Sequence, residues 1–91
     1  MNQRRSYIEI IAEMLKIGEN GAGKTKIMYA ANMSYYQLNK YLGLLLDRGL
    51  INELTPVNHH FNYQVTEKGM KLLSSIGDVL GALESEEEIR N

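Results

Sequence analysis

The chain has 91 residues, of which 44% are hydrophobic and 23% charged, with a formal net charge of −1 and no cysteine. This length suits a single small domain of ordinary globular composition. Disulfides and thiolate metal sites are excluded, no apolar run is long enough to span a bilayer, and the segment behind the basic N-terminus lacks the cleavage site of an export signal. We therefore expect a cytoplasmic protein.

The charges are unevenly distributed along the chain. Residues 1–77 carry nine basic and six acidic side chains, a net charge of +3. The acidic residues behind them are opposed only by Arg90 and are Asp78, Glu84, Glu86, Glu87 and Glu88. A mildly basic body with an acidic end predicts that the body would face a polyanion such as DNA and that the end would face away from it.

The first third of the chain predicts two helices separated by a loop. Ser6 and Glu9 have the spacing of a capping box, and apolar residues at helical spacing follow, which indicates a helix over residues 7–17. The glycine-dense residues 18–23 are expected to form a loop. A short second helix is expected over residues 24–31, with a turn at Asn32 and Met33.

The middle of the chain predicts a longer helix and a β-hairpin. Ser34 and Gln37 form a second capping box, and Gly49 supplies the end of this third helix. Residues 50–54 and the alternating residues 61–65 then read as two strands joined by a turn. The apolar stripe of the third helix, expected in the core, contains Leu38, Tyr41, Leu42 and Leu45.

The last helix is predicted to begin at Glu67 after an N-cap at Thr66, to be short, and to fray among its terminal glutamates. Its apolar residues recur every three or four positions, more than one small domain covers easily, and two glycines four residues apart would let a partner helix approach closely. We expect a homodimer seam here, a coiled coil, although the helix folding back onto its own domain is the alternative. The expected seam residues are Leu73, Ile76, Gly77, Leu80, Gly81 and Leu83.

Three helices, a hairpin and a further helix give the predicted fold class: mainly α with a small β-hairpin, a winged helix-turn-helix followed by a C-terminal dimerisation helix. Residues 1–66 would form the DNA-binding domain and residues 67–91 the dimer helix with its acidic frayed end. In this arrangement the N-terminal residues of the third helix enter the major groove, the second helix braces it, and the hairpin forms a wing over the neighbouring strand.

Four segments of the chain carry a resemblance to a known family, namely residues 24–34, 38–42, 50–51 and 63–69. With these residues the chain resembles the archaeal winged-helix proteins, and among them the small Sulfolobus chromatin-associated DNA-binding proteins. The similarity runs from about Arg4 to Leu83. It implies DNA binding as a homodimer, with the recognition helix and wing as contacts and an antiparallel pair of last helices as the seam. This chain departs from the pattern in the shortness and glycine content of its last helix.

The candidate DNA-binding residues lie on the third helix, at the start of the second helix, on the wing and at the N-terminus. Gln37 is the leading candidate for a direct base contact, because a side-chain amide pairs with adenine, although the capping box also uses it. The alternative is that these polar residues only cover an exposed helix face or a solvated loop. The candidates are Arg4, Arg5, Lys24, Lys26, Ser34, Tyr35, Tyr36, Gln37, Asn39, Lys40, His59 and His60.

Residues 18–25, Gly18 to Thr25, match the phosphate-loop pattern G-x-x-x-x-G-K-[ST], yet we do not expect nucleotide binding. That motif needs a buried strand before the loop, and here a helix is predicted instead. The chain also lacks an apolar strand ending in an aspartate that would hold the metal. Lys24 and Lys26 would rather contact DNA phosphates.

These observations favour a nucleoid-associated protein that binds double-stranded DNA as a homodimer, either as a transcriptional regulator or as a chromatin-like architectural protein. A protein-interaction winged helix that does not bind DNA is the alternative. No arrangement of nucleophile, acid and base emerges, so neither catalysis nor a cofactor is expected. The adjacent His59 and His60 point in different directions and form no metal site without further ligands.

Overall fold

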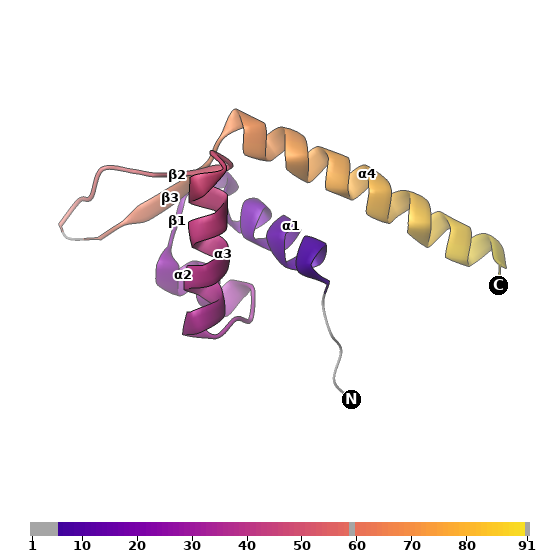
Figure 1. The fold of residues 1–91 in the computed structure, drawn as a ribbon, viewed down its shortest axis with the longest axis horizontal. Coiled ribbons are helices and arrows are strands. Elements are labelled where there is room, and N and C mark those ends of the chain that lie inside the picture. The colour runs from indigo at the N-terminus through magenta and orange to yellow at the C-terminus, as the bar shows by residue number, and fades with distance from the viewer. Residues whose placement is uncertain (1–5, 59, 91) are drawn as a thin grey trace.

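The computed structural model describes residues 6–58 and 60–90 (Figure 1). The chain is mostly helical and folds around a small antiparallel sheet, which confirms the predicted mainly α fold with a β-hairpin and a C-terminal helix. In chain order the elements are α1 (Tyr7–Ile17), the 3₁₀ turn η1 (Gly18–Asn20), β1 (Ala22–Gly23), α2 (Lys24–Ala30), α3 (Tyr35–Asp47), β2 (Ile51–Glu53), β3 (Asn62–Val65) and α4 (Glu67–Arg90).

Both predicted capping boxes are present. Ser6 Oγ accepts a hydrogen bond from the backbone N–H of Glu9 at 3.0 Å, and Glu9 Oε1 accepts one from the backbone N–H of Ser6 at 2.9 Å. Ser34 and Gln37 make the same reciprocal pair at the start of α3. Each box satisfies two backbone donors that the first helical turn would otherwise leave unpaired, which is why α1 and α3 begin where the sequence predicts.

The third helix ends as predicted at Gly49, whose φ of +70° lies in the left-handed region that glycine adopts without strain. The backbone N–H of Gly49 donates to Leu46 O and that of Leu50 to Leu45 O, the paired bonds of a Schellman motif. These bonds turn the chain sharply from α3 into β2. Helix α3 and the hairpin are therefore joined without a flexible linker.

The expected loop at residues 18–23 is more ordered than the sequence predicted. It contains η1 and then β1, which pairs antiparallel with β3 through Ala22↔Tyr63 and Gly23↔Asn62. The predicted hairpin is confirmed and is shorter at its ends, with β2 paired to β3 through Ile51↔Val65 and Glu53↔Tyr63. The sheet order is thus β1-β3-β2, three strands instead of the two that the sequence indicated.

The core lies between α1, α2, α3 and the inner face of the sheet. Its largest fully buried side chains come from α1, α2, α3 and β2, and they are Met14, Leu15, Ile27, Leu38, Leu45 and Ile51. Tyr41 is only partly buried and packs its ring 5.8 Å from that of Tyr7. Among the described residues, every buried side-chain nitrogen or oxygen has a hydrogen-bond partner.

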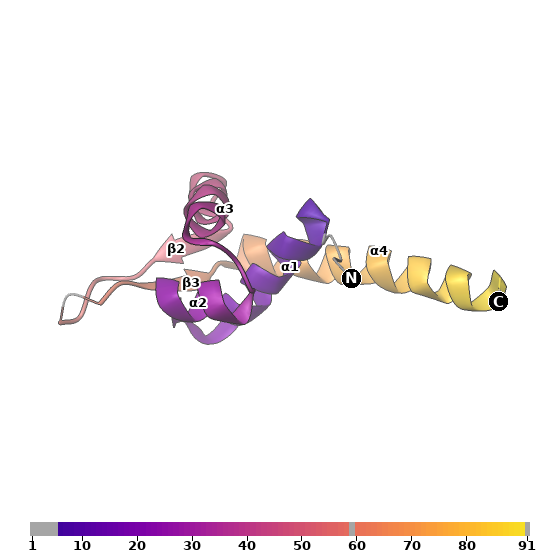
Figure 2. The ribbon, with the colours of Figure 1, turned by 90° about the horizontal axis from the view of Figure 1, so that it is seen from below.

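The last helix begins at Glu67, as the sequence predicts, and is longer than the short helix that was expected. It continues for 24 residues to Arg90, because glutamate is a strong helix former and no proline interrupts the segment. Its first half packs against α1, and its second half projects away from the body, opposite to the hairpin (Figure 2). Among the described residues, this and the other helices lack the combination of length and apolar character needed to cross a membrane.

Candidate nucleic-acid interface

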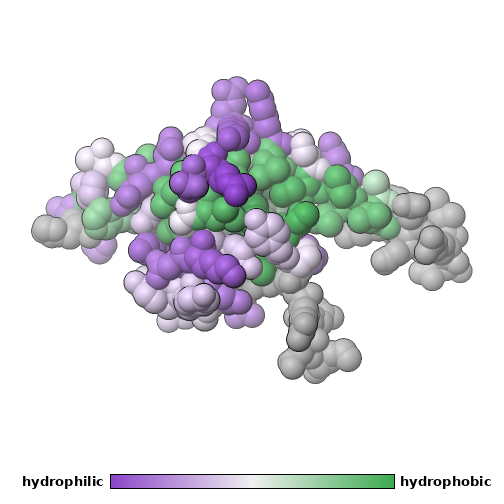
Figure 3. Space-filling view, in the orientation of Figure 1, coloured by the Kyte–Doolittle hydropathy of each residue, from purple (hydrophilic) through white to green (hydrophobic). Residues whose placement is uncertain are grey.

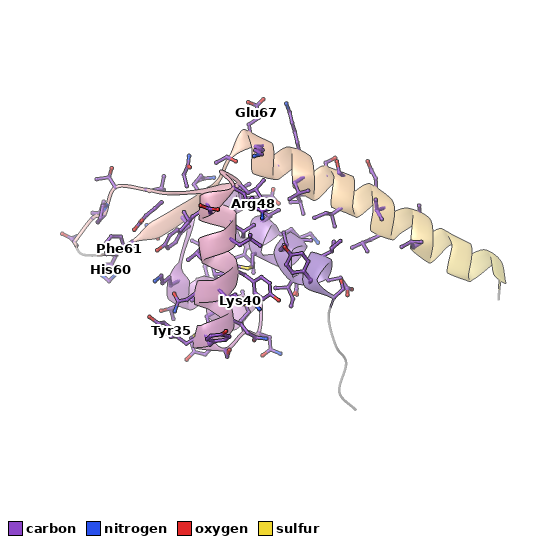
Figure 4. The ribbon with its side chains drawn as sticks, in the orientation of Figure 1. Tyr35, Lys40, Arg48, His60, Phe61 and Glu67 are labelled. Atoms are coloured by element: carbon purple, nitrogen blue, oxygen red, sulfur yellow. The ribbon has the colours of Figure 1, made fainter. Side chains whose placement is uncertain are left out.

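The N-terminal half of α3 presents its polar face to solvent. Leu38, Leu42 and Leu45 turn one side of the helix into the core. At about 100° per residue, Tyr36, Lys40 and Gly43 lie on the opposite side. Tyr36 is 75% exposed and Tyr35 65%, and Figure 4 shows Tyr35 and Lys40 along the lower part of α3. This arrangement is the one that lets the start of a recognition helix reach base edges.

Lys40 is the cation of this outward face. Its Nζ lies 5.7 Å from the centroid of the Tyr41 ring, within range of a cation–π contact, and the side chain remains exposed. The turn that sets α3 against α2 is compact, because Asn32 adopts a φ of +54° and the Met33 N–H donates to Met28 O. Lys40 is therefore carried on a helix whose orientation is fixed by the turn before it.

The two side-chain amides of this region are engaged within the protein. Gln37 Oε1 accepts the backbone N–H of Ser34 at 3.0 Å, so Gln37 serves the capping box. Asn39 Nδ2 donates to Tyr35 O at 3.2 Å, and Asn39 Oδ1 accepts a hydrogen bond from Lys24 Nζ at 3.2 Å. A bidentate contact with adenine needs both the oxygen and the nitrogen of one amide, and neither residue has both available in this state.

A cleft of about 440 Å³ opens between the start of α2 and the hairpin. Lys24, Thr25 and Lys26 line one wall, and His60 and Phe61 line the other. Lys26 and His60 are exposed, and Figure 4 shows His60 and Phe61 on the hairpin side of α3. The cleft brings three of the predicted DNA-binding residues, Lys24, Lys26 and His60, to one side of the molecule, although His60 is 34 residues from Lys26 in the sequence.

The segment that matches the phosphate-loop pattern, residues 18–25, follows helix α1 and packs against the sheet. As the sequence predicts, helix α1 directly precedes it. Gly18 is buried, and a Cβ added there would lie 3.1 Å from Val65 Cγ2. The side chain of Gln64 donates to the carbonyl of Glu19, which ties η1 to the sheet. The start of this segment, η1, therefore packs against β3. In a true phosphate loop, a buried strand would lead directly into the segment.

The hairpin, which forms the wing, is buried where it joins the body of the protein and exposed toward its tip. Tyr63 is 4% exposed and pairs across the sheet with Glu53. Burial raises the pKa of the Tyr63 hydroxyl above its ordinary value of 10.0, and the charge of Glu53 raises it further. Near the tip, Val57 and His60 form an isolated bridge, and Val57 is 66% exposed. In the described part of the chain, no three His, Asp or Glu side chains gather to hold a metal ion.

Some residues of the predicted dimer seam are covered by the monomer itself, and the others remain exposed. Ile76 is only 8% exposed and belongs to the monomer's own core, while Leu73 and Leu80 pack partly against it. Leu83 remains 53% exposed, and a Cβ at either Gly77 or Gly81 would meet nothing within 4 Å. The sequence underestimated how much of α4 would be covered by α1, because the crossing of these two helices is a tertiary contact.

An apolar groove of about 210 Å³ lies beside α4. Tyr7, Ile8 and Ile11 of α1 line it together with Leu72 and Ile76 of α4. Figure 3 shows this hydrophobic surface continuing along α4 beyond the body, where Val79 is 58% exposed. The sequence did not predict that the start of α1 would join Val79 and Leu83 on the exposed apolar side.

Three of the predicted DNA-binding residues, Arg4, Arg5 and His59, lie outside the described residues, as do the side chains of the acidic cluster at residues 84–88. Conversely, the sequence did not single out Tyr29, which is 75% exposed at the end of α2. The signal was available, since the apolar face of that helix is formed by Ile27 and Ala31 and leaves position 29 outside.

Comparison with known proteins gives one family and several similar structures. Residues 4–84 match the winged helix-turn-helix family. The protein MJ0287 of Methanocaldococcus jannaschii is 35% identical over 83 residues, which cover 90% of this chain and 80% of that protein. MJ0290 of the same organism is 42% identical over 77 residues, but the chain spans only about a third of its length.

Among solved structures, Sso10a-2, a DNA-binding protein from Sulfolobus solfataricus, superposes with a TM-score of 0.85 at 30% identity and covers 94% of this chain and 90% of its own. A variant of the transcription regulator MepR from Staphylococcus aureus, bound to an oligodeoxyribonucleotide, gives a TM-score of 0.71 at 15% identity. That alignment covers 92% of this chain and 62% of MepR, and at this identity it shows a shared fold alone.

Proposed function

The chain belongs to the winged helix-turn-helix family, and from this premise we propose that it binds double-stranded DNA as a homodimer at the nucleoid, as a transcriptional regulator or chromatin-like architectural protein, without catalysing a reaction. The observation that carries the proposal is the outward face of α3, where Tyr36 and Lys40 are exposed opposite the buried leucines. The similarity to Sso10a-2, a DNA-binding protein, supports it.

The positions of the exposed lysines agree with this use. Lys26 before the middle of α2 and His60 on the hairpin are exposed on the two sides of one cleft, and Lys40 lies on α3. A recognition helix in the major groove would place such flanking groups near the phosphates of both strands. The acidic end of the chain lies on α4, which projects away from the hairpin (Figure 1).

The homodimer part of the proposal rests on α4. The half of this helix that projects beyond the body carries Val79 and Leu83, both more than half exposed. The apolar groove beside it supplies a complementary surface on the same molecule. A two-fold pair would bury both surfaces twice, which favours a closed dimer over an open chain of contacts.

The test is binding to a random-sequence duplex across a salt series. If about six phosphates are neutralised per dimer, the slope of log affinity against log salt is expected to be about −5. The double substitution Lys26→Ala with Lys40→Ala should flatten the slope by about 1 for each phosphate that the variant no longer neutralises. Lys16→Ala is the matched control, because Lys16 is an exposed lysine of α1 that lies beside Leu80 of α4 and does not line the cleft between α2 and the hairpin.

A second candidate is a protein-interaction winged helix that does not bind DNA, and the exposed apolar groove is the observation that favours it. It predicts no binding of any duplex at low salt and a slope that cannot be measured. That result would contradict the DNA-binding proposal and direct the search to protein partners of α1 and α4.

A further inference from the structure

We infer that the sequence preference of this protein comes from apolar contacts between the exposed tyrosine rings at the start of α3, above all Tyr36, and the C5 methyl groups of thymine in the major groove. The inference rests on the proposed DNA binding and concerns which groups read the bases. Gln37 and Asn39, the residue types that usually read adenine, act here as positioning residues that hold the helix and its neighbour.

The first support is the state of the two amides. Gln37 Oε1 is bound to the backbone N–H of Ser34, and that bond belongs to the capping box that starts the helix. Asn39 is engaged at both atoms, by the carbonyl of Tyr35 and the ammonium of Lys24. If either amide turned toward a base, it would leave behind an unpaired donor or acceptor of its own helix, which offsets what it gains from adenine.

The second support is the exposure and position of the tyrosines. Tyr36 is 75% exposed and lies on the side of α3 opposite Leu38 and Leu42, which are buried. Tyr35 is 65% exposed one residue before it, and both rings belong to the first turn of the helix. The first turn is the part of a recognition helix that meets base edges. Two large, exposed rings are thus carried to the point of contact.

The third support is the surroundings of Tyr36 on its own face. One and two turns further along the outward side lie Lys40 and then Gly43, and a Cβ added at Gly43 would meet nothing within 4 Å. Lys40 can hold a phosphate, while the missing side chain at Gly43 lets the helix approach the groove closely. A close approach is what contact between a ring and a methyl group requires.

The chemistry of the major groove then selects the ligand group. Thymine offers the apolar C5 methyl there, whereas the groove edges of the other bases present hydrogen-bond donors and acceptors. A phenol ring covers a methyl with its apolar face, and its hydroxyl reaches outward to a phosphate. Burial of one methyl-sized group corresponds to about fourfold in affinity.

The experiment compares three duplexes of one sequence: an unmodified duplex, one with uracil in place of thymine, and one with 7-deazaadenine in place of adenine. Uracil removes only the methyl group, and 7-deazaadenine removes the N7 acceptor that an amide would need. We expect the wild-type protein to bind the uracil duplex about fourfold or more weakly than the thymine duplex. We expect it to bind the 7-deazaadenine duplex with unchanged affinity.

Substitutions assign the effect to the ring. Tyr36→Phe keeps the ring and should keep the discrimination between thymine and uracil, whereas Tyr36→Ala should abolish most of it. Tyr29→Ala removes an equally exposed tyrosine from α2 and should leave the ratio of the two affinities as it is in the wild type. Circular dichroism checks that each variant retains its helices.

Equal binding of the thymine and uracil duplexes by the wild-type protein overturns the inference while leaving the DNA-binding proposal intact. A loss of affinity for the 7-deazaadenine duplex also overturns it, because the amides would then read adenine. Failure to bind any of the three duplexes at low salt overturns the proposed function, and the inference with it.

Discussion

Lys24 Nζ lies 3.2 Å from Oδ1 of Asn39, so the first residue of α2 is hydrogen-bonded to the second turn of α3. The same asparagine holds the carbonyl of Tyr35 through its Nδ2 atom. The two helices of the helix-turn-helix are therefore joined through polar side chains as well as through their apolar sides. This contact also sets where the ammonium group of Lys24 lies relative to α3.

Asn39→Ala removes this contact and is expected to lower the free energy of unfolding by about 1 kcal/mol or less, since the bond is exposed to water. A double-mutant cycle with Lys24→Ala, measured by urea unfolding, isolates the coupling between the two side chains. We expect the second substitution to cost less in the presence of the first. Strictly additive effects would show that the hydrogen bond does not contribute to stability in solution.

Gly69→Ala is expected to destabilise the protein by about 2 to 3 kcal/mol or more. A Cβ at this position would lie 2.2 Å from the carbonyl oxygen of Leu50 and 2.8 Å from Val65 Cγ1, and the backbone carbonyl cannot move aside cheaply. Thermal and urea unfolding measure the destabilisation. The start of α4 depends on this close approach, because Thr66 Oγ1 both accepts the N–H of Gly69 and donates to Gly49 O.

Gly43→Ala is the matched control for that substitution. Gly43 lies inside α3 with open space around it, so the added methyl should stabilise the free protein by up to about 1 kcal/mol through helix propensity. If both substitutions changed the stability by the same amount and sign, the close contact of Gly69 with Leu50 would have no energetic consequence.

The sequence predicted well wherever a local pattern decides the structure. The capping boxes at Ser6 and Ser34 and the glycine at position 49 each act within one helical turn, so their effect can be read from spacing alone. The hairpin and the helix-turn-helix order followed from these boundaries. The fold class was therefore predictable from residue types and their spacing.

The sequence predicted the structure poorly wherever contacts between distant segments determine it. β1 is only two residues long and exists because it pairs with β3, about 40 residues away. Likewise, Ile76 and Val79 look equivalent on a helical stripe, yet α1 covers the first and leaves the second exposed. The role of Gln37 was ambiguous for another reason, since one amide suits both a capping box and a base contact.

Alkaline pH is expected to destabilise the protein through Tyr63. The raised pKa of its hydroxyl means that the folded state holds the proton more tightly than the unfolded state does. The resulting stabilisation is fully present below pH 10.0, the ordinary value for tyrosine, and is lost as the pH rises through the folded-state pKa. Urea unfolding at a series of pH values up to about 11 measures this destabilisation, and Tyr63→Phe should reduce it.

Glu53→Gln separates the two causes of this pKa shift. It removes the negative charge opposite Tyr63 but leaves the ring buried, so the alkaline destabilisation should become smaller and persist. Burial is the larger of the two causes. An alkaline profile that is unchanged in Tyr63→Phe would exclude this tyrosine as the titrating group.

Leu83→Glu and Val79→Glu are expected to convert the proposed dimer into a monomer. Each places a charge on the exposed apolar side of α4, where a partner would have to bury it without a counter-charge. Sedimentation equilibrium should report dissociation of the dimer, and the Tm should no longer depend on protein concentration. A monomer presents one recognition helix to DNA, so the salt slope should fall to about half.

Ser74→Glu provides the control, because Ser74 is an exposed residue of the same helix about 160° from Ile76 and on the side away from Val79 and Leu83. It adds the same charge without entering the apolar surface, so the dimer should persist. If Leu83→Glu also remained dimeric while Gly77→Leu dissociated, the partner helix would lie on the glycine side of α4, and the apolar groove beside α1 would be free for another occupant.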